Sequence, residues 1–255
     1  MSGRALRRGA AILAGLPIGL ALALWAGTAA AQEINLDFGA GGSSTDLIVQ
    51  LVALVTILSL APSILVMITS FTRIVVVLSF LRTAMGVQQT PPNNVLISLA
   101  LFLTAFVMAP VFQQSWDQGL RPLIDQELEI DEAFPLAAAP FRDFMLSHVR
   151  EEDLRLFMDM GEVEAAEPTD VPLHVLIPAF MISELRRAFE IGFLLFLPFV
   201  VIDMVVASIL MSMGMMMLPP IMISLPFKVV FFVLVDGWYM VAGSLVQSYG
   251  PTTAF

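Results

Sequence analysis

Four apolar stretches, each close to the length that crosses a lipid bilayer, constrain the fold of this chain more than any other feature. They run from Leu47 to Thr69, from Val95 to Phe112, from Ile191 to Met213 and from Ile221 to Val246. A helix needs about 20 predominantly apolar residues to cross the hydrocarbon core. Since 58% of the 255 residues are hydrophobic and only 13% are charged, the sequence predicts an all-α integral membrane protein with four long apolar helices in two hairpins.

The N-terminus has the three-part pattern of a secretory signal peptide. Three arginines within the first eight residues precede an apolar run, Ala10–Ala26, and Ala29–Ala31 supplies a small-residue cleavage site. We therefore predict a cleaved signal peptide over residues 1–31 and a flexible periplasmic tether over 32–46. An uncleaved first transmembrane helix is the alternative.

The charges between the apolar stretches predict an orientation. Arg73 and Arg82 are the only charged residues between the first two stretches, and such arginines favour the cytoplasmic side. The expected order is a first hairpin (47–112) with a cytoplasmic-side loop (70–94), an acidic periplasmic loop (113–178), a second hairpin (179–248) with a methionine-rich loop (211–220), and a periplasmic tail (249–255).

The acidic loop accounts for the net charge of −10, because residues 113–175 hold 15 acidic residues against four arginines. Such a polyanionic segment excludes nucleic acid and anionic lipid headgroups as its own partners. Mixed apolar and polar spacing over Pro140–Met160 predicts a small helical pair or arch inside the loop. The loop is either an assembly face or a solvated surface.

Charged residues interrupt the last two apolar stretches. A charge at the bilayer centre costs roughly 2.5–3.5 kcal/mol, so such residues usually face a partner or a watery cavity. On a helix, Glu184 can meet Arg187 and Arg186 can meet Glu190 locally. Lys228 is the only lysine and has no acidic residue within four positions, so its partner must come from another helix or another subunit. The isolated or clustered charges predicted to be buried are Arg186, Arg187, Asp203 and Asp236.

Prolines and methionines mark the second hairpin further. Pro198 and Pro226 each remove a backbone donor inside an apolar stretch and are predicted to kink their helices. The segment Met211–Pro220 is rich in methionine, a flexible side chain that packs against surfaces of changing shape. It suits a constriction that both seals and yields, and the alternative is a hydrophobic turn in lipid.

No motif predicts catalysis. The chain has no cysteine, and neither His148 nor His174 has a companion at metal-ligand spacing. No phosphate-binding loop occurs, so we expect no enzyme activity, no metal and no cofactor. An ion-coupled transporter that uses Asp203, Lys228 and Asp236 as a proton relay is the competing function.

Four segments resemble the FliP family of flagellar export proteins. They are LRTAMGVQQTPPN at 81–93, FMISELRRAFEIGF at 180–193, MGMMMLPP at 213–220 and SLPFK at 224–228. The resemblance extends from about Leu47 to Val246. The SctR-type homologues of virulence secretion share this core but usually lack a cleaved signal, so the signal favours the flagellar branch.

The resemblance implies an export gate in the bacterial inner membrane, within the flagellar basal body. It implies a homo-oligomer of about five copies that forms a helical cone with FliQ- and FliR-type proteins, next to FlhB- and FlhA-type proteins. Unfolded flagellar subunits would pass through it, and much of the apolar mass would stand above the membrane plane. A methionine gasket is implied at Met215, Met216 and Met217, and an ion pair between neighbouring subunits at Glu184 and Lys228.

Overall fold

The computed structural model describes residues 44–87, 89–164, 170–215 and 218–250, and within these ranges all regular secondary structure is helical. The chain divides into two compact units, residues 1–56 and 57–255. The predicted signal peptide and residues 32–43 of the predicted tether lie outside the described residues. The helices are α2 (Ser44–Met67), α3 (Phe71–Ala84), α4 (Asn93–Ser115), the π-helical turn η1 (Trp116–Leu120), α5 (Arg121–Ile124), α6 (Ile130–His148), α7 (Glu151–Met160), α8 (Leu173–Ser212), α9 (Pro220–Leu234) and α10 (Gly237–Gln247).

Two of these helical segments are long and apolar enough to cross a membrane by themselves. One covers residues 93–124, which joins α4, η1 and α5, and the other is α8 with 40 residues. The described residues hold up to four candidate membrane spans if α2–α3 and α9–α10 each count as one bent span. The prediction of an all-α membrane protein is therefore confirmed, and in the described part of the chain two spans run without a sharp bend.

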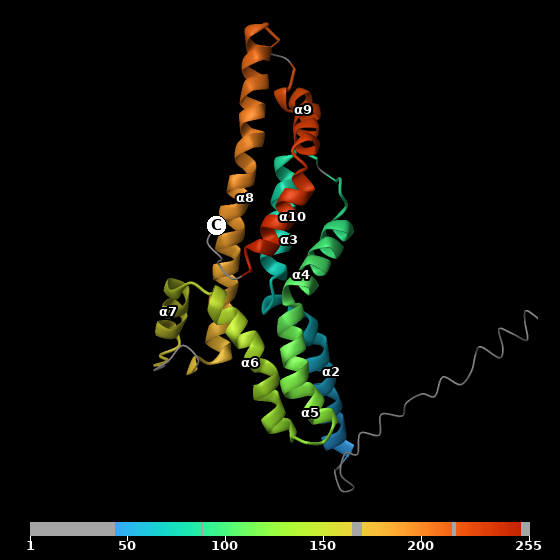
Figure 1. The fold of residues 1–255 in the computed structure, drawn as a ribbon, viewed down its shortest axis with the longest axis vertical. Helices are drawn as coiled ribbons and strands as arrows, with labels where there is room; N and C mark the ends of the chain where they lie inside the picture. Colours follow the sequence, from blue (N-terminus) through green and yellow to red (C-terminus); the bar gives the residue numbers. More distant parts are fainter. Residues whose placement is uncertain (1–43, 88, 165–169, 216–217, 251–255) are drawn as a thin grey trace, which may run out of the picture. The chain divides into compact units, whose positions relative to one another are not determined.

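The segment predicted as the cytoplasmic-side loop 70–94 is mostly helix, so that prediction is corrected. Ile74, Val77, Leu78 and Leu81 recur at helical spacing and are at most 1% exposed, which gives α3 a continuous apolar face. α3 packs along α8 and α4 (Figure 1). The two arginines suggested a loop, but Arg73 is neutralised inside the fold and the segment can be buried.

The third apolar stretch is only the second half of α8. The helix begins at Leu173 and continues through Pro178, Pro198 and the charged residues around Glu184 to Ser212. The fourth stretch, in contrast, is divided at Asp236, whose φ of 50° ends α9 and starts α10 at a bend of 62°. Pro226 lies inside α9, which continues past it.

The acidic region is helical, as expected. Two helices cover the segment 140–160 for which a helical pair is predicted, but α6 begins earlier, at Ile130; α6 packs against α4 and η1, and α7 packs against α8. A Cβ on Gly119 of η1 would lie 2.6 Å from the backbone nitrogen of Ala137 in α6. A side chain at this position would therefore push the two helices apart.

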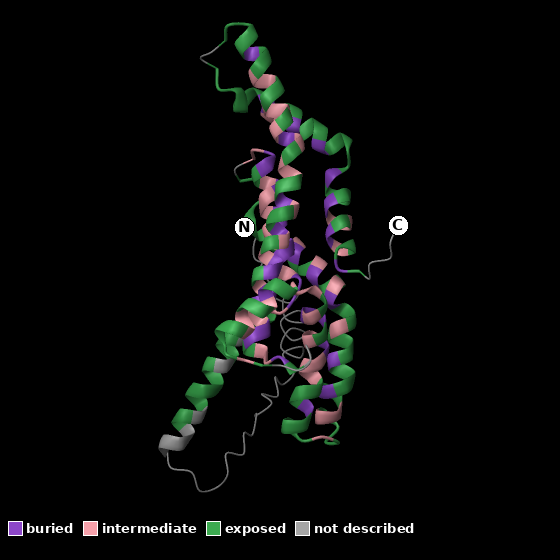
Figure 2. Cartoon of the chain, turned by 90° about the vertical axis from the view of Figure 1, so that its left-hand side faces the viewer, coloured by how far each residue is buried: buried purple, intermediate pink, exposed green. Residues whose placement is uncertain are grey.

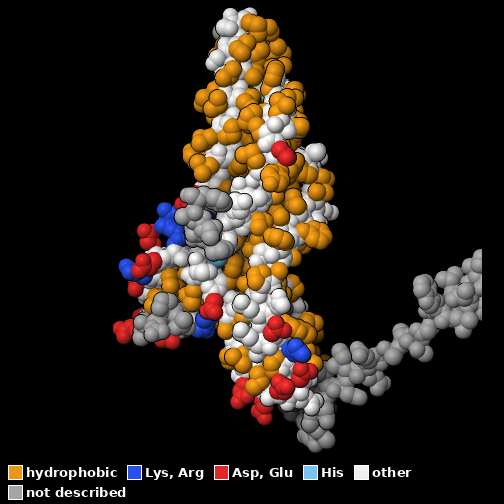
Figure 3. Space-filling view, viewed as in Figure 1, with side chains coloured by type: hydrophobic (Ala, Val, Ile, Leu, Met, Phe, Trp, Pro, Cys, Tyr) orange, Lys and Arg blue, Asp and Glu red, His pale blue; other side chains and the backbone are white. Residues whose placement is uncertain are grey.

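Apolar side chains cover much of the surface of the second unit. Figure 2 shows exposed residues along the upper part of the chain, where α8 and α9 lie, and buried residues mainly further down. Phe193, Val201, Met204 and Val233 are 58–70% exposed. In Figure 3 hydrophobic side chains dominate the upper region, while acidic side chains gather lower down. A surface of this kind requires lipid or other protein helices around it.

Candidate functional site: buried ion pairs and the methionine loop

The most deeply buried charges are Arg73 of α3 and Glu184 of α8, which are 1% and 0% exposed. Their side chains form a bidentate pair: Nε of Arg73 donates to Oε2 of Glu184 at 2.9 Å, and Nη2 donates to Oε1. Two parallel hydrogen bonds of this type fix both the distance and the orientation of the two groups. The pair thus joins the two helices that form the centre of the fold.

The chain segment after α10 completes this cluster. Nη1 of Arg73 donates to Oγ of Ser248 at 3.0 Å, and the hydroxyl of Tyr249 donates to Glu184. The guanidinium carbon of Arg73 lies 3.9 Å above the centre of the Tyr249 ring, a favourable cation–π arrangement. Burial, followed by the negative charge of Glu184, raises the pKa of Tyr249 well above its usual value, so the phenol stays a proton donor.

A second ion pair joins α8 and α9; its lysine is buried, while its aspartate is 33% exposed. Nζ of Lys228 lies 2.6 Å from Oδ2 of Asp203, and the same amine donates to the carbonyl oxygen of Ala84 at 3.3 Å. Oγ of Ser224 donates to the other oxygen of Asp203 at 2.5 Å. The partner that the sequence required for Lys228 therefore comes from another helix of the same chain.

A polar contact also fastens α7 to α8. Oγ of Ser183 donates to Oδ2 of Asp153 at 2.7 Å and accepts the backbone N–H of Arg150 at 3.0 Å. Close by, the ring of His148 lies 5.1 Å from the ring of Tyr249. Burial is the main cause that lowers the pKa of His148 below 6.5.

The remaining charged residues are less buried than the sequence predicted. Arg186 forms the expected local pair with Glu190 at 3.2 Å, but its side chain is 54% exposed. The other expected local pair, Arg187 with Glu184, is not formed among the described residues, because Glu184 pairs with Arg73. Asp236 is exposed at the break between α9 and α10, so within this chain it is not a buried charge.

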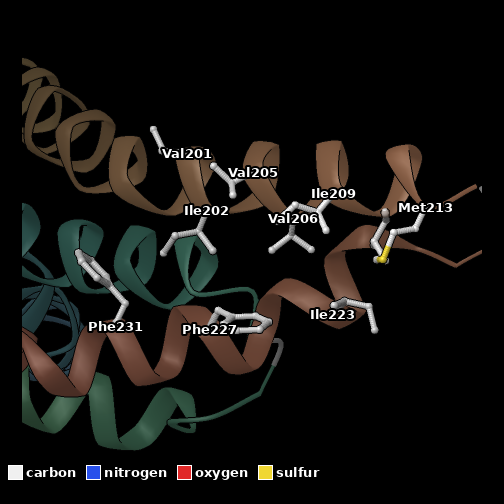
Figure 4. Close-up of a pocket in the computed structure, with 10 residues that line it drawn as sticks. Val201, Ile202, Val205, Val206, Ile209, Met213, Ile223, Phe227 and Phe231 are labelled. Carbon is white, nitrogen blue, oxygen red and sulfur yellow. The ribbon is translucent and has the colours of Figure 1, made fainter. Parts of the chain in front are cut away.

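The methionine loop connects α8 and α9. Gly214 has a φ of +73°, which favours glycine, and Met213 and Met215 are 54% and 41% exposed. Met216 and Met217 lie outside the described residues. Just before the loop, α8 and α9 enclose an apolar groove of 460 Å³ that Met213, Ile223 and Phe227 help to line (Figure 4).

Sequence reasoning missed three members of the central cluster: Arg73, Ser248 and Tyr249. Arg73 was assigned to a loop, although the apolar spacing after it signals a helix. Ser248 and Tyr249 carry no signal of their own, because their role depends on how the end of the chain returns to α3 and α8.

The fold and these buried pairs define an all-α membrane protein whose long helices present apolar flanks and whose deepest charges are neutralised in pairs. The chain belongs to the FliP family, since the model of the FliP family matches residues 54–245. The flagellar biosynthetic protein FliP of Caulobacter vibrioides is 62% identical over 232 residues, which cover 90% of this chain and 87% of that protein. The FliP protein of Bacillus subtilis is 53% identical over 86% of this chain and 99% of its own length, and that of Aquifex aeolicus is 52% identical over 79% and 85%.

Proposed function

We propose that this protein is a core subunit of the flagellar type III export gate, the inner-membrane channel through which unfolded flagellar subunits leave the cytoplasm. The observation that carries the proposal is family membership over residues 54–245, together with the high identity to proteins named flagellar biosynthetic protein FliP. The role is transport rather than catalysis.

The exposed apolar flanks support assembly with other membrane helices. The groove between α8 and α9 is lined by aliphatic and aromatic side chains (Figure 4), and Phe193, Met204 and Val233 project from the same two helices. Several copies, about five, would close a ring by a repeated head-to-tail contact. FliQ- and FliR-type proteins would cover the rest, with FlhB- and FlhA-type proteins nearby.

The methionine loop is proposed as the seal of that ring. A gate for unfolded chains meets side chains of every kind, so specific hydrogen bonds cannot close it. Thioether side chains at Met215–Met217 would exclude water and ions, and they would rearrange around a passing peptide because methionine is flexible.

An ion pair of Glu184 with Lys228 of a neighbouring subunit is a further part of the proposal. Within the chain both residues already have partners, Arg73 and Asp203. Pairing between subunits would therefore require each of them to exchange or share its partner on assembly.

The orientation follows the charge distribution. The mature N-terminus, the acidic region and the C-terminus are proposed to lie on the periplasmic side, and the turn after α3 and the methionine loop on the cytoplasmic side. The competing proton relay lacks a continuous path among the described residues, since no hydrogen bond or ion pair connects Asp236 with Asp203 or Lys228.

An export assay tests the proposal directly. Deletion of the gene in the bacterium that encodes it should abolish secretion of flagellar subunits into the medium, while the subunits still accumulate inside the cell. Re-expression of the chain should restore secretion. Normal secretion by the deletion strain would overturn the assignment.

A further inference from the structure

A pocket of 620 Å³, lined by both polar and apolar side chains, lies where α3 ends and α9 begins. Its walls include Arg82 and Thr83 of α3, Gln89 and Thr90 of the following turn, and Lys228 of α9. We propose that this pocket binds the phosphate group of an anionic phospholipid.

The charge balance of the pocket favours an anion. The described hydrogen bonds of Arg82 go to two neutral oxygens, the carbonyl of Pro91 at 3.4 Å and Oδ1 of Asn93 at 2.5 Å. No carboxylate among the described residues lies within ion-pair distance of this guanidinium. Lys228 adds a second positive charge that Asp203 balances, so the pocket keeps one uncompensated cation.

The geometry of the turn leaves room for a ligand. Gly86 has a φ of +76°, and a Cβ there would lie 3.9 Å from Nζ of Lys228. The turn therefore passes directly over the amine without covering it by a side chain. Guanidinium groups bind phosphate oxygens through two parallel hydrogen bonds, and Thr90, which also lines the pocket, carries a hydroxyl donor.

The position of the pocket favours a lipid over a free phosphate. Arg82 lies in the last turn of α3, and Ile221 and Met222 lie in the first turn of α9, so the pocket is at the ends of two apolar helices. Ile221 and Met222 line it and are 63% and 67% exposed, which offers apolar contact to acyl chains. Basic pockets between membrane helices on the cytoplasmic side bind anionic headgroups, and the orientation proposed above places this pocket on that side. The acidic region, which repels such lipids, is a separate part of the chain.

Native mass spectrometry of the full-length chain in detergent tests the proposal by titration with phosphatidylglycerol, phosphatidylcholine and soluble glycerol phosphate. We expect phosphatidylglycerol to bind at least tenfold more tightly than phosphatidylcholine, a difference of about 1.4 kcal/mol. Gln89→Glu places a negative charge on an exposed wall residue without removing a described contact, and it should weaken phosphatidylglycerol binding about tenfold. Gln118→Glu, at an exposed position in η1, is the matched control and should leave binding unchanged.

Arg82→Gln should weaken phosphatidylglycerol binding at least as much as Gln89→Glu does, and Arg121→Gln should not weaken it. If Arg82→Gln does not fold, Gln89→Glu still decides the outcome. Equal binding of the two lipids, or unchanged binding in the folded pocket variants, would overturn the proposal. Glycerol phosphate binding as tightly as phosphatidylglycerol would overturn the lipid as the source of the phosphate.

Discussion

Replacing Arg73 by methionine would leave the carboxylate of Glu184 buried without its counter-charge. Removing one member of a buried pair costs about 3–5 kcal/mol. The hydroxyl of Tyr249 still donates to Glu184 in this variant. We therefore expect the free energy of unfolding to fall by about 3 kcal/mol, at the lower end of that range. Glu184→Met should cost a similar amount, because Arg73 keeps only Ser248 and the Tyr249 ring.

The double variant distinguishes pairing from general damage to the core. With both charges replaced by methionine, no buried charge remains, and such replacements are often close to neutral. We expect a coupling energy of at least about 2 kcal/mol between the two positions. Equilibrium unfolding in mixed micelles, followed by the fluorescence of Trp116 and Trp238, measures the free energy of unfolding of all three variants.

The exposed pair of Arg121 and Asp125 is the matched control. Its atoms are 3.7 Å apart and its side chains are 65% and 52% exposed, so Arg121→Gln should change the free energy of unfolding by less than about 1 kcal/mol. Additive effects of Arg73→Met and Glu184→Met would refute the claim that these two side chains stabilise the fold as a pair.

Three further predictions test the proposed methionine seal, the proposed ion pair between subunits and the protonation of His148. Replacing Met215–Met217 by alanine should raise ion leakage through the assembled gate without preventing assembly. Ion flux into reconstituted vesicles measures the leakage, and a variant that assembles and stays ion-tight would exclude the proposed seal. Either single charge reversal, Glu184→Lys or Lys228→Glu, should weaken assembly, and the two together should restore it. Native gels measure the amount of assembled complex, and a double variant that assembles no better than the single variants would argue against direct pairing between subunits. Burial lowers the pKa of His148 in the folded protein below 6.5, so the unfolded state binds the proton more readily. The stability that neutral His148 contributes is therefore complete above pH 6.5 and is lost as the pH decreases below that value. Unfolding measured as a function of pH should show a smaller decrease on acidification in His148→Gln, and an identical decrease would assign the dependence to other groups.

The apolar stretches predicted the helices because burial in lipid or protein leaves a polar backbone few other conformations. The error over residues 70–94 has a definite cause. A charged residue inside an apolar run looks like a loop until its partner is known, and the partner of Arg73 is 111 positions away in the sequence. Local spacing cannot reveal a contact of this range.

The candidate site, like the fold, was only partly predictable from the sequence. Sequence reasoning required a partner for Lys228 outside its own helix, and Asp203 of α8 is that partner. It did not identify Asp203, because the family resemblance implied Glu184 of a neighbouring subunit as the partner, whereas within the chain Glu184 pairs with Arg73. The break that places Asp236 at the surface depends on a left-handed backbone conformation at a non-glycine residue, which composition does not predict.

The proposed function makes this chain one subunit of a multi-subunit export gate. The native mass of the detergent-solubilised complex, measured with and without co-expressed FliQ- and FliR-type proteins, distinguishes such a gate from a small unit. We predict a ring of several copies that gains mass when the partners are present. A monomer or dimer whose mass does not change with the partners would contradict the account.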